Sequence, residues 1–522
     1  MSQPESLAPA AQRGMLRIES DGAIALLLVG LGLGAGLAAR LRWPFDGLYG
    51  QDAFAYFRYA RALWPWLLHG TPLPIYYWPA GYPLLVALAL PLAGWGSAGG
   101  QSVSIIAGSG AAGLTYCLSR ELLPRAPGGR AAALVAGLAV ALSGAVLRAR
   151  LVVMSDALAL ACCAAAPWAL ARYARTGRGG WLVAAALALA WAIITRWVCG
   201  LLALPLLAFV LIAARTNDHG RGLGRTAHLS SFALRPRWLA AFAVGALVVV
   251  PQVIASAATP AALTRHQWVE TWSAANAWRR DFTTVDGTQH YSLPVAVFYL
   301  AQMAWPSFLA TPLALLALPG AIWLARERSW AALALLAGWP LTLWLFLLGI
   351  PYENARFVLP ALPALAALAG LGFAWAYAAA ASWRRAALAA GLALALAGGL
   401  AWGLRDYHRL VADKDEQLAL VAWVRGRLPA DGTLLTFGAT LTLQHYTAYD
   451  VRELFYLAPA DLDGVVRQRR PTYLLLDVAN IERQWAGLRP QQDYHYLQRR
   501  PGLQAVGQRA NYTLFRVGRP GQ

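Results

Sequence analysis

Apolar stretches of about 20 residues recur through most of the chain, from residue 22 to about residue 403. A helix needs about 20 apolar residues to cross the hydrocarbon core of a bilayer. We therefore predict eleven transmembrane helices, at 22–39, 101–119, 131–147, 154–171, 180–195, 198–214, 238–256, 294–319, 330–349, 357–380 and 386–403. Such a chain is a polytopic α-helical membrane protein whose immediate partner is the lipid bilayer.

The composition excludes several other classes of protein. Hydrophobic residues make up 58% of the chain and charged residues 13%, against about 25% charged residues in soluble domains. The formal net charge of +19 would suit a nucleic-acid-binding protein, but the hydrophobicity would not, so we expect no nucleic-acid partner. All four cysteines fall inside predicted spans, which excludes a disulfide scaffold.

Basic residues predict the orientation. The apolar segment 82–94 is short for a span. If it does not cross, one side of the membrane collects 17 basic residues, from the N-terminal segment and the loops 120–130, 172–178, 215–237, 326–328 and 384–385. Because cytoplasmic loops are enriched in Arg and Lys, we predict a cytoplasmic N-terminus in the plasma (inner) membrane, a first span that stays as an uncleaved anchor, and a surface helix at 82–94 on the outer face.

The composition changes after Trp402. Short apolar runs then occur at Leu434–Phe437, Tyr473–Val478 and Tyr512–Val517, and helix-like stretches at 415–428 and 460–469. This alternation predicts a small α/β domain at 404–522, after a membrane domain at 1–403. An odd number of spans makes that domain extracytoplasmic.

Two aspartates on the predicted outer side are candidate catalytic residues, since polar residues at the edge of a membrane bundle are often functional. Asp52 lies in the first outer loop, at about 40–81, either as a helix N-cap or as a general base. Asp156 opens a span, which is also a favourable place for any acidic residue. Arg148 and Arg150 precede it and suit either a phosphate or the membrane interface.

Further candidates for substrate binding share the same side. Glu353 and Arg356 are spaced to pair on one helix face, or Arg356 holds an anionic group. Tyr82 belongs to an aromatic, proline-rich segment that fits a membrane interface or a sugar-stacking surface. The remaining basic candidates are Arg58 and Arg196.

The loop 257–292 holds four residues of metal-ligating type, His266, Glu270, Asp281 and His290. Their spacing is irregular, so we interpret the loop as solvated and predict no metal site. No Walker or Rossmann phosphate loop occurs, which argues against the use of a cytoplasmic nucleotide through those motifs.

The order of these motifs resembles the GT-C superfamily of membrane glycosyltransferases. A first span is followed by a long outer loop with an early Asp52, then by an Arg-rich stretch before Ser155-Asp156, and later by Glu353-x-x-Arg356-Phe357-x-x-Pro360. The chain looks most like the protein O-mannosyltransferase and lipid A aminoarabinose transferase types, including the Rgt-like bacterial branch. Many relatives have Asp-Glu in the first loop where this chain has Asp52-Ala53, which weakens the protein O-mannosyltransferase assignment.

The resemblance implies a polyprenyl-phosphate sugar donor, a site on the outer face, and a glycan, lipid or protein acceptor. By resemblance Asp52 is the catalytic base or organises the acceptor, Asp156 is the second acidic position, and Arg356 faces the donor phosphate. No cofactor follows from it, and divalent metal use is left open because members differ. The alternatives are a transporter or flippase, a polymerase or ligase of lipid-linked glycans, and a binding protein that uses the outer domain.

Overall fold

The computed structural model describes residues 8–123, 126, 128–216, 236–258, 267–468, 470–500 and 502–518. The predictions made for Arg125, His266 and most of the loop 215–237 concern residues outside these ranges.

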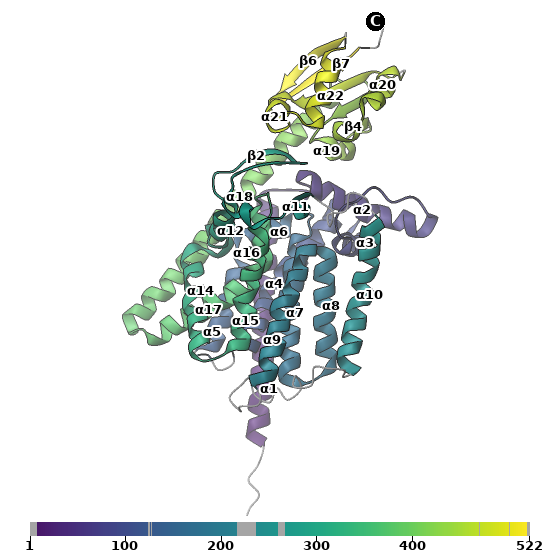
Figure 1. Ribbon diagram of the computed structural model, residues 1–522. Coiled ribbons are helices and arrows are strands. Elements are labelled where there is room, and N and C mark those ends of the chain that lie inside the picture. Colours follow the sequence, from purple (N-terminus) through teal and green to yellow (C-terminus); the bar gives the residue numbers. More distant parts are fainter. Residues whose placement is uncertain are drawn as a thin grey trace, which may run out of the picture.

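Helices make up the membrane part, and they run side by side in Figure 1. They are α1 (Ala8–Arg42), α4 (Ser97–Leu122), α5 (Gly129–Ala141), α6 (Gly144–Leu151), α7 (Asp156–Thr176), α8 (Gly179–Thr195), η1 (Trp197–Leu202), α9 (Ala203–Thr216), α10 (Pro236–Ala258), α12 (Val295–Met303), α13 (Pro306–Leu309), α14 (Thr311–Arg326), α15 (Trp330–Leu336), α16 (Gly338–Leu347), η5 (Ala355–Ala361), α17 (Leu362–Ala379) and α18 (Ser382–Arg425).

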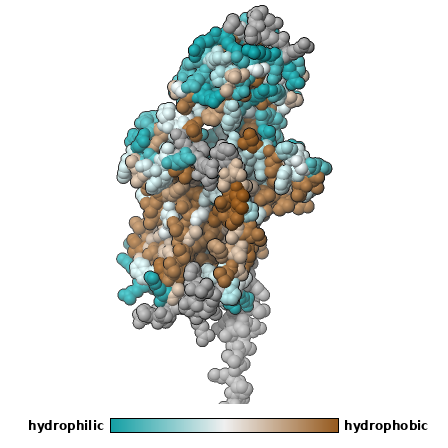
Figure 2. All heavy atoms as spheres, turned by 45° about the vertical axis from the view of Figure 1, so that its right-hand side comes forward, coloured by the Kyte–Doolittle hydropathy of each residue, from teal (hydrophilic) through white to brown (hydrophobic). Residues whose placement is uncertain are grey.

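The structure has eight to ten candidate spans where eleven were predicted. Within the described ranges, eight helices are long and apolar enough to cross a bilayer, and the number rises to ten if each of two bent pairs, α5–α6 and α12–α14, is one span. The predicted span 180–195 corresponds to α8, a shorter apolar helix of 17 residues that packs between α7 and α10. Figure 2 shows the hydrophobic band that these helices form between two hydrophilic ends. The chain is a multi-span membrane protein.

A set of short elements covers one end of the bundle (Figure 1). They are α2 (Gly50–His69), α3 (Gly81–Ala93), α11 (Gln267–Glu270), η4 (Ala274–Trp278), and the hairpin strands β1 (Asp281–Thr284) and β2 (Gly287–His290). The predicted surface helix at 82–94 corresponds to α3, whose 13 residues pack against α2 and α4.

The C-terminal α/β domain lies beyond the same end of the bundle and confirms the fold predicted for it (Figure 1). Its elements are β3 (Thr433–Thr436), α19 (Thr440–Tyr446), β4 (Asp450–Glu453), η6 (Leu454–Tyr456), α20 (Pro459–Arg467), β5 (Thr472–Asp477), α21 (Val478–Gln484), α22 (Arg489–Gln498), β6 (Leu503–Arg509) and β7 (Tyr512–Val517). The sheet has the order β4-β3-β5-β7-β6, with β3 parallel to β4 and β5, and β7 antiparallel to β5 and β6.

Strand alternation gives this sheet two buried faces. Leu434 and Leu475 belong to a core with the end of α18 and with α19. Their neighbours Leu435 and Leu474 belong to a second core, beside α20 and α22. The stretch predicted as a separate helix at 415–428 is the end of α18, which runs unbroken from the membrane into the domain.

Candidate active site

Asp52 lies in the first turn of α2, at the end of the bundle that faces the C-terminal domain. Gly50 has a φ of +68°, so the chain turns sharply into the helix there. Tyr49 is the N-cap residue, and its side chain makes no capping hydrogen bond. The Asp52 carboxylate accepts a hydrogen bond from Arg356 Nη2 at 3.2 Å. Asp52 is therefore not the helix cap, and its carboxylate faces the bundle.

Arg356 joins the two predicted catalytic aspartates. Its Nη1 lies 3.6 Å from Asp156 Oδ2, while Nη2 donates to Asp52. Asn354 caps η5 and accepts from the backbone N–H of Arg356 at 3.1 Å and from its Nε at 3.4 Å. The Asn354 amide thereby orients the guanidinium between two carboxylates that are 104 residues apart in the chain (52 to 156).

Asp156 is buried at the start of α7 and forms a second ion pair with Arg196. Arg196 lies between α8 and η1 and stacks over the ring of Phe357 at 5.5 Å. We call Asp52, Asp156, Arg196 and Arg356 the site cluster. Its four formal charges cancel.

Aromatic side chains border the site cluster. On one side Tyr352 stacks on Trp268 at 4.2 Å, and Phe357 lies 6.1 Å from Tyr352. On the other side the Tyr56 hydroxyl and Ser155 Oγ form a hydrogen bond of 3.1 Å. Burial, together with the negative charge of Asp52, raises the pKa of Tyr56 to about 12. Tyr56 therefore stays protonated and neutral at physiological pH.

Sequence reasoning missed Tyr56, Asn354 and Trp268 as neighbours of the site. One signal for Tyr56 was present, because a residue four positions after Asp52 lies on the same helix face. No comparable signal existed for Trp268, which lies in α11, more than 200 residues further along the chain than Asp52.

Several predicted substrate-binding residues lie elsewhere. Arg58 is exposed and donates to Gln444 of the C-terminal domain at 2.8 Å. Arg150 is fully buried between helices and donates to the carbonyls of Gly32 and Val140, at 3.2 and 3.3 Å. Tyr82 is also buried, and its hydroxyl bonds Ser104 Oγ at 2.7 Å.

The remaining two predicted residues lie near the site cluster without joining it. Arg148 is exposed at the end of α6, close enough for its charge to repel that of Arg356. Glu353 does not form the ion pair that the i, i+3 spacing allowed, since Arg356 pairs with the two aspartates. Its Oε1 is buried and has no hydrogen-bond partner among the residues that the structure describes, and burial raises the pKa of Glu353 to about 7.

The metal candidates do not assemble within the described residues. Asp281 and His290 pair across the exposed β1–β2 hairpin. No group of three or more His, Cys, Asp or Glu side chains in the described ranges is arranged to hold a metal ion.

The comparisons with known proteins assign the fold. Residues 78–254 match the family model of dolichyl-phosphate-mannose-protein mannosyltransferase, a region that includes Asp156 and Arg196 but neither Asp52 nor Arg356. The structure of ArnT from Cupriavidus metallidurans bound to undecaprenyl phosphate aligns over 95% of this chain and 99% of its own, with a TM-score of 0.62 and 14% identity. The chain has the GT-C fold.

A second GT-C structure is similar over a smaller share of its length. The oligosaccharyltransferase AglB from Archaeoglobus fulgidus, in complex with an inhibitory peptide and a dolichol-phosphate, aligns over 88% of this chain and 70% of its own. Its TM-score is 0.57 and its sequence identity 13%. A search of curated proteins found no match. The GT-C fold thus rests on the three-dimensional arrangement far more than on sequence identity.

Proposed function

We propose that this protein is a glycosyltransferase that moves a sugar from a polyprenyl-phosphate donor to an acceptor at the membrane face next to the C-terminal domain. The observation that carries the proposal is the site cluster, in which Arg356 holds Asp52 and Asp156 together at that face. Two structures with the same fold contain polyprenyl phosphates, undecaprenyl phosphate in ArnT and a dolichol-phosphate in AglB.

Exposure separates the roles of the two aspartates. The Asp52 side chain is 33% exposed, whereas that of Asp156 is 3% exposed. A general base must reach the acceptor hydroxyl, so Asp52 takes the acceptor proton. Asp156, on the buried side of the site cluster, holds Arg196 and Arg356 in place.

The reaction is a single displacement that inverts the anomeric carbon. The acceptor oxygen attacks that carbon, its proton passes to Asp52, and the bond from the carbon to the phosphate oxygen breaks. The polyprenyl phosphate leaves with the electron pair, and Arg356 and Arg196 stabilise its growing charge. A bound phosphate competes with Asp52 for Arg356, which frees the carboxylate to act as a base.

The donor sugar is a hexose or pentose, and the acceptor is a glycan, lipid or protein. We place the N-terminus in the cytoplasm and the C-terminal domain outside, in the plasma (inner) membrane, because the basic loops gather at the opposite end of the bundle. Labelling of single introduced cysteines with an impermeant reagent in intact cells tests this orientation. Labelling of the C-terminal domain only after lysis contradicts it.

Asp52→Asn tests the catalytic role. Purified protein is incubated with a panel of polyprenyl-phosphate sugars, and the released polyprenyl phosphate is measured. Loss of the base is expected to lower the rate at least 100-fold, while the melting temperature stays within a few degrees. Asp413→Asn is the matched control, since Asp413 is an exposed carboxylate near α2 that accepts a hydrogen bond from the Tyr49 hydroxyl at 3.0 Å. Near-normal transfer by Asp52→Asn contradicts the role assigned to Asp52.

A further inference from the structure

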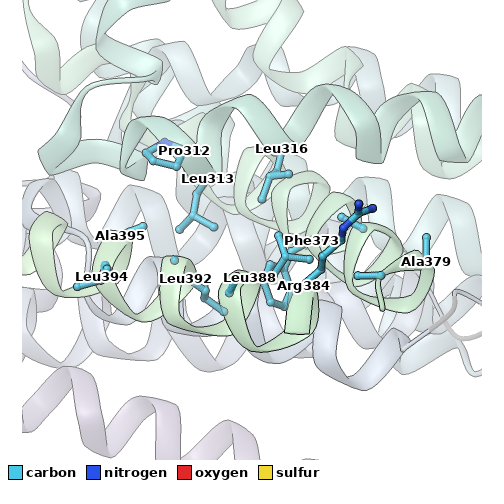
Figure 3. A pocket seen from close by; sticks show the side chains of 14 residues that line it. Pro312, Leu313, Leu316, Phe373, Ala379, Arg384, Leu388, Leu392, Leu394 and Ala395 are labelled. Atoms are coloured by element: carbon cyan, nitrogen blue, oxygen red, sulfur yellow. The ribbon is translucent and has the colours of Figure 1, made fainter. Parts of the chain in front are cut away.

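A large apolar groove lies inside the membrane band, away from the site cluster. It separates the first turns of α18 from α14 and α17 and has a volume of about 1000 Å³. That volume is at the upper end of the range for ligand sites, which is about 300–1,000 Å³. Figure 3 shows its walls, which come from α14, α17 and α18 and are apolar apart from Arg384.

The groove exists because only two of its three helices are in close contact. α14 and α17 touch through glycines, since a Cβ on Gly320 would lie 2.0 Å from Leu368 O, and one on Gly372 would lie 2.0 Å from Leu316 O. Along α18 the corresponding glycine, Gly391, meets no atom within 4 Å of its ideal Cβ position. The start of α18 therefore stands apart from the other two helices.

The charged end of the groove lies at the membrane end opposite the C-terminal domain. Arg384 is in the first turn of α18 and stacks on the exposed ring of Trp383 at 5.2 Å. The neighbouring Arg385 is engaged, because it donates to the carbonyls of Tyr377 and Ala378 at the end of α17. In the described part of the chain no carboxylate forms an ion pair with Arg384.

We propose that this groove binds one acyl chain of an anionic phospholipid, with the lipid phosphate at Arg384. Tryptophan and arginine are the residues that mark the headgroup level of a membrane. The groove extends along α18 from Arg384 to Ala395, a rise of about 16 Å at ~1.5 Å per residue. One leaflet contributes about 15 Å of a ~30 Å hydrocarbon core, so the length of the groove along α18 is comparable to the thickness of a single leaflet.

The position of the charge distinguishes this ligand from the sugar donor. The donor phosphate belongs at the site cluster, at the other end of the bundle. A donor held there cannot also place its phosphate at Arg384. The groove therefore requires an anion from the leaflet opposite the C-terminal domain. The exclusion of the sugar donor rests on the proposed function, whereas the groove and the position of Arg384 do not.

Binding of defined lipids to the delipidated full-length protein tests the proposal by native mass spectrometry. Phosphatidylglycerol is compared with phosphatidylcholine of the same chains. A basic residue near the headgroup contributes about 1 kcal/mol to binding of an anionic lipid, so we expect an approximately fivefold preference for phosphatidylglycerol. Arg384→Gln should abolish this preference, while Arg405→Gln, on the same helix but outside the groove, should retain it.

A filling variant tests the groove itself. Gly391→Leu places a side chain in the open space, and we expect it to lower retention of both lipids at least fivefold. Gly398→Leu is the matched control, because its Cβ also meets no atom within 4 Å but Gly398 does not line the groove. The proposal is overturned if Gly391→Leu binds lipid normally, if Arg384→Gln keeps the preference, or if polyprenyl phosphate displaces phosphatidylglycerol one for one.

Discussion

Two groups of charged residues flank the first turn of α2, and they are built differently. In the anchor cluster, formed by Asp46, Lys414 and Tyr446, the ammonium of Lys414 donates to Leu48 O at 2.7 Å and to the Tyr446 hydroxyl at 2.8 Å, and lies 3.6 Å from Asp46 Oδ1. It also lies over the rings of Phe54 and Tyr446, at 4.9 and 4.6 Å.

The two clusters differ in the exposure of their cations, since the carboxylates Asp46 and Asp52 are exposed to a similar extent, 34% and 33%. The Lys414 ammonium donates two hydrogen bonds and forms one ion pair, and its side chain is 3% exposed. In the site cluster the side chains of Arg356 and Asp52 remain 24% and 33% exposed. We infer that the buried cation of the anchor cluster joins the long helix α18 to the segment before α2, and that the site cluster, whose cation is partly exposed, is the one available for chemistry.

Arg356→Gln should show the largest effect and only on catalysis. Without the guanidinium the departing phosphate loses a cation, and we expect transfer to fall about 100- to 1000-fold. The melting temperature should change little, because Asp156 keeps its pair with Arg196. The assay is release of polyprenyl phosphate, with Arg58→Gln as the control on the same face. If Arg356→Gln unfolds instead, the site cluster has a structural role like that of the anchor cluster, and the proposed difference between the two clusters is wrong.

Lys414→Met should have the opposite effect to Arg356→Gln, with a loss of stability and little change in transfer. Removing the ammonium leaves Leu48 O without its side-chain donor and Asp46 without its cation, although Asp46 still accepts from the Leu48 N–H and the Tyr446 hydroxyl. We expect a loss of about 2 kcal/mol in stability, because Asp46 is partly exposed. Thermal unfolding in detergent, followed by tryptophan fluorescence, measures it. Transfer per folded molecule should stay within about threefold of wild type.

Lys414→Arg sharpens that test. Of the 44 basic residues Lys414 is the one lysine, and a compact ammonium suits a site with three converging acceptors better than a planar guanidinium does. We therefore expect Lys414→Arg to be destabilised too, although the charge is kept. Asp415→Asn, at the exposed neighbouring position, should unfold like wild type.

Gln51 connects the two clusters to the C-terminal domain, and its removal should have a smaller effect. Its Nε2 donates to Gly438 O at 2.8 Å, and its Oε1 accepts from the backbone N–H of Leu441 at 3.0 Å. Because Asp52 is the next residue, Gln51→Ala should loosen the placement of Asp52 and lower kcat about fivefold. This value is in line with the loss of two neutral hydrogen bonds, one exposed and one partly buried. Gln492→Ala, which loses an exposed bond within the domain, is the control. An unchanged kcat would mean that the domain does not position Asp52.

The sequence predicted the fold better than the contacts within the site. Spans and the α/β domain follow from local hydrophobic patterns, so their prediction succeeded. Arg356 and Asp52 are 304 residues apart, and only a common membrane side related them before the structure. The local spacing suggested Glu353 as the partner of Arg356, but packing of η5 against α7 brings Asp156 closer.

The two arginines before Asp156 show why the direction of a side chain could not be predicted from the sequence. Arg148 and Arg150 are two residues apart on α6, which places them about 200° apart around the helix. One therefore reaches the membrane surface and the other enters the bundle. Which one does so depends on how α6 packs in the bundle, after a bend of 50° from α5, and the two arginines alone do not indicate this packing.

Glu353 belongs to neither cluster, and its effect should be the smallest and should depend on pH. Burial raises its pKa from an ordinary 4.5 to about 7 in the folded protein, so folding favours the neutral carboxyl. Its contribution to stability is complete below the unfolded pKa and is lost as the pH rises through 7. The melting temperature of wild type should therefore fall from pH 5 to pH 8 more than that of Glu353→Gln, which cannot ionise. Glu416→Gln, an exposed change on α18, should keep the wild-type slope. If Glu353→Gln also keeps the wild-type slope, Glu353 does not change its ionisation between pH 5 and pH 8. Glu353 would then be ionised and paired with a cation, and it would have to be counted as a member of the site cluster.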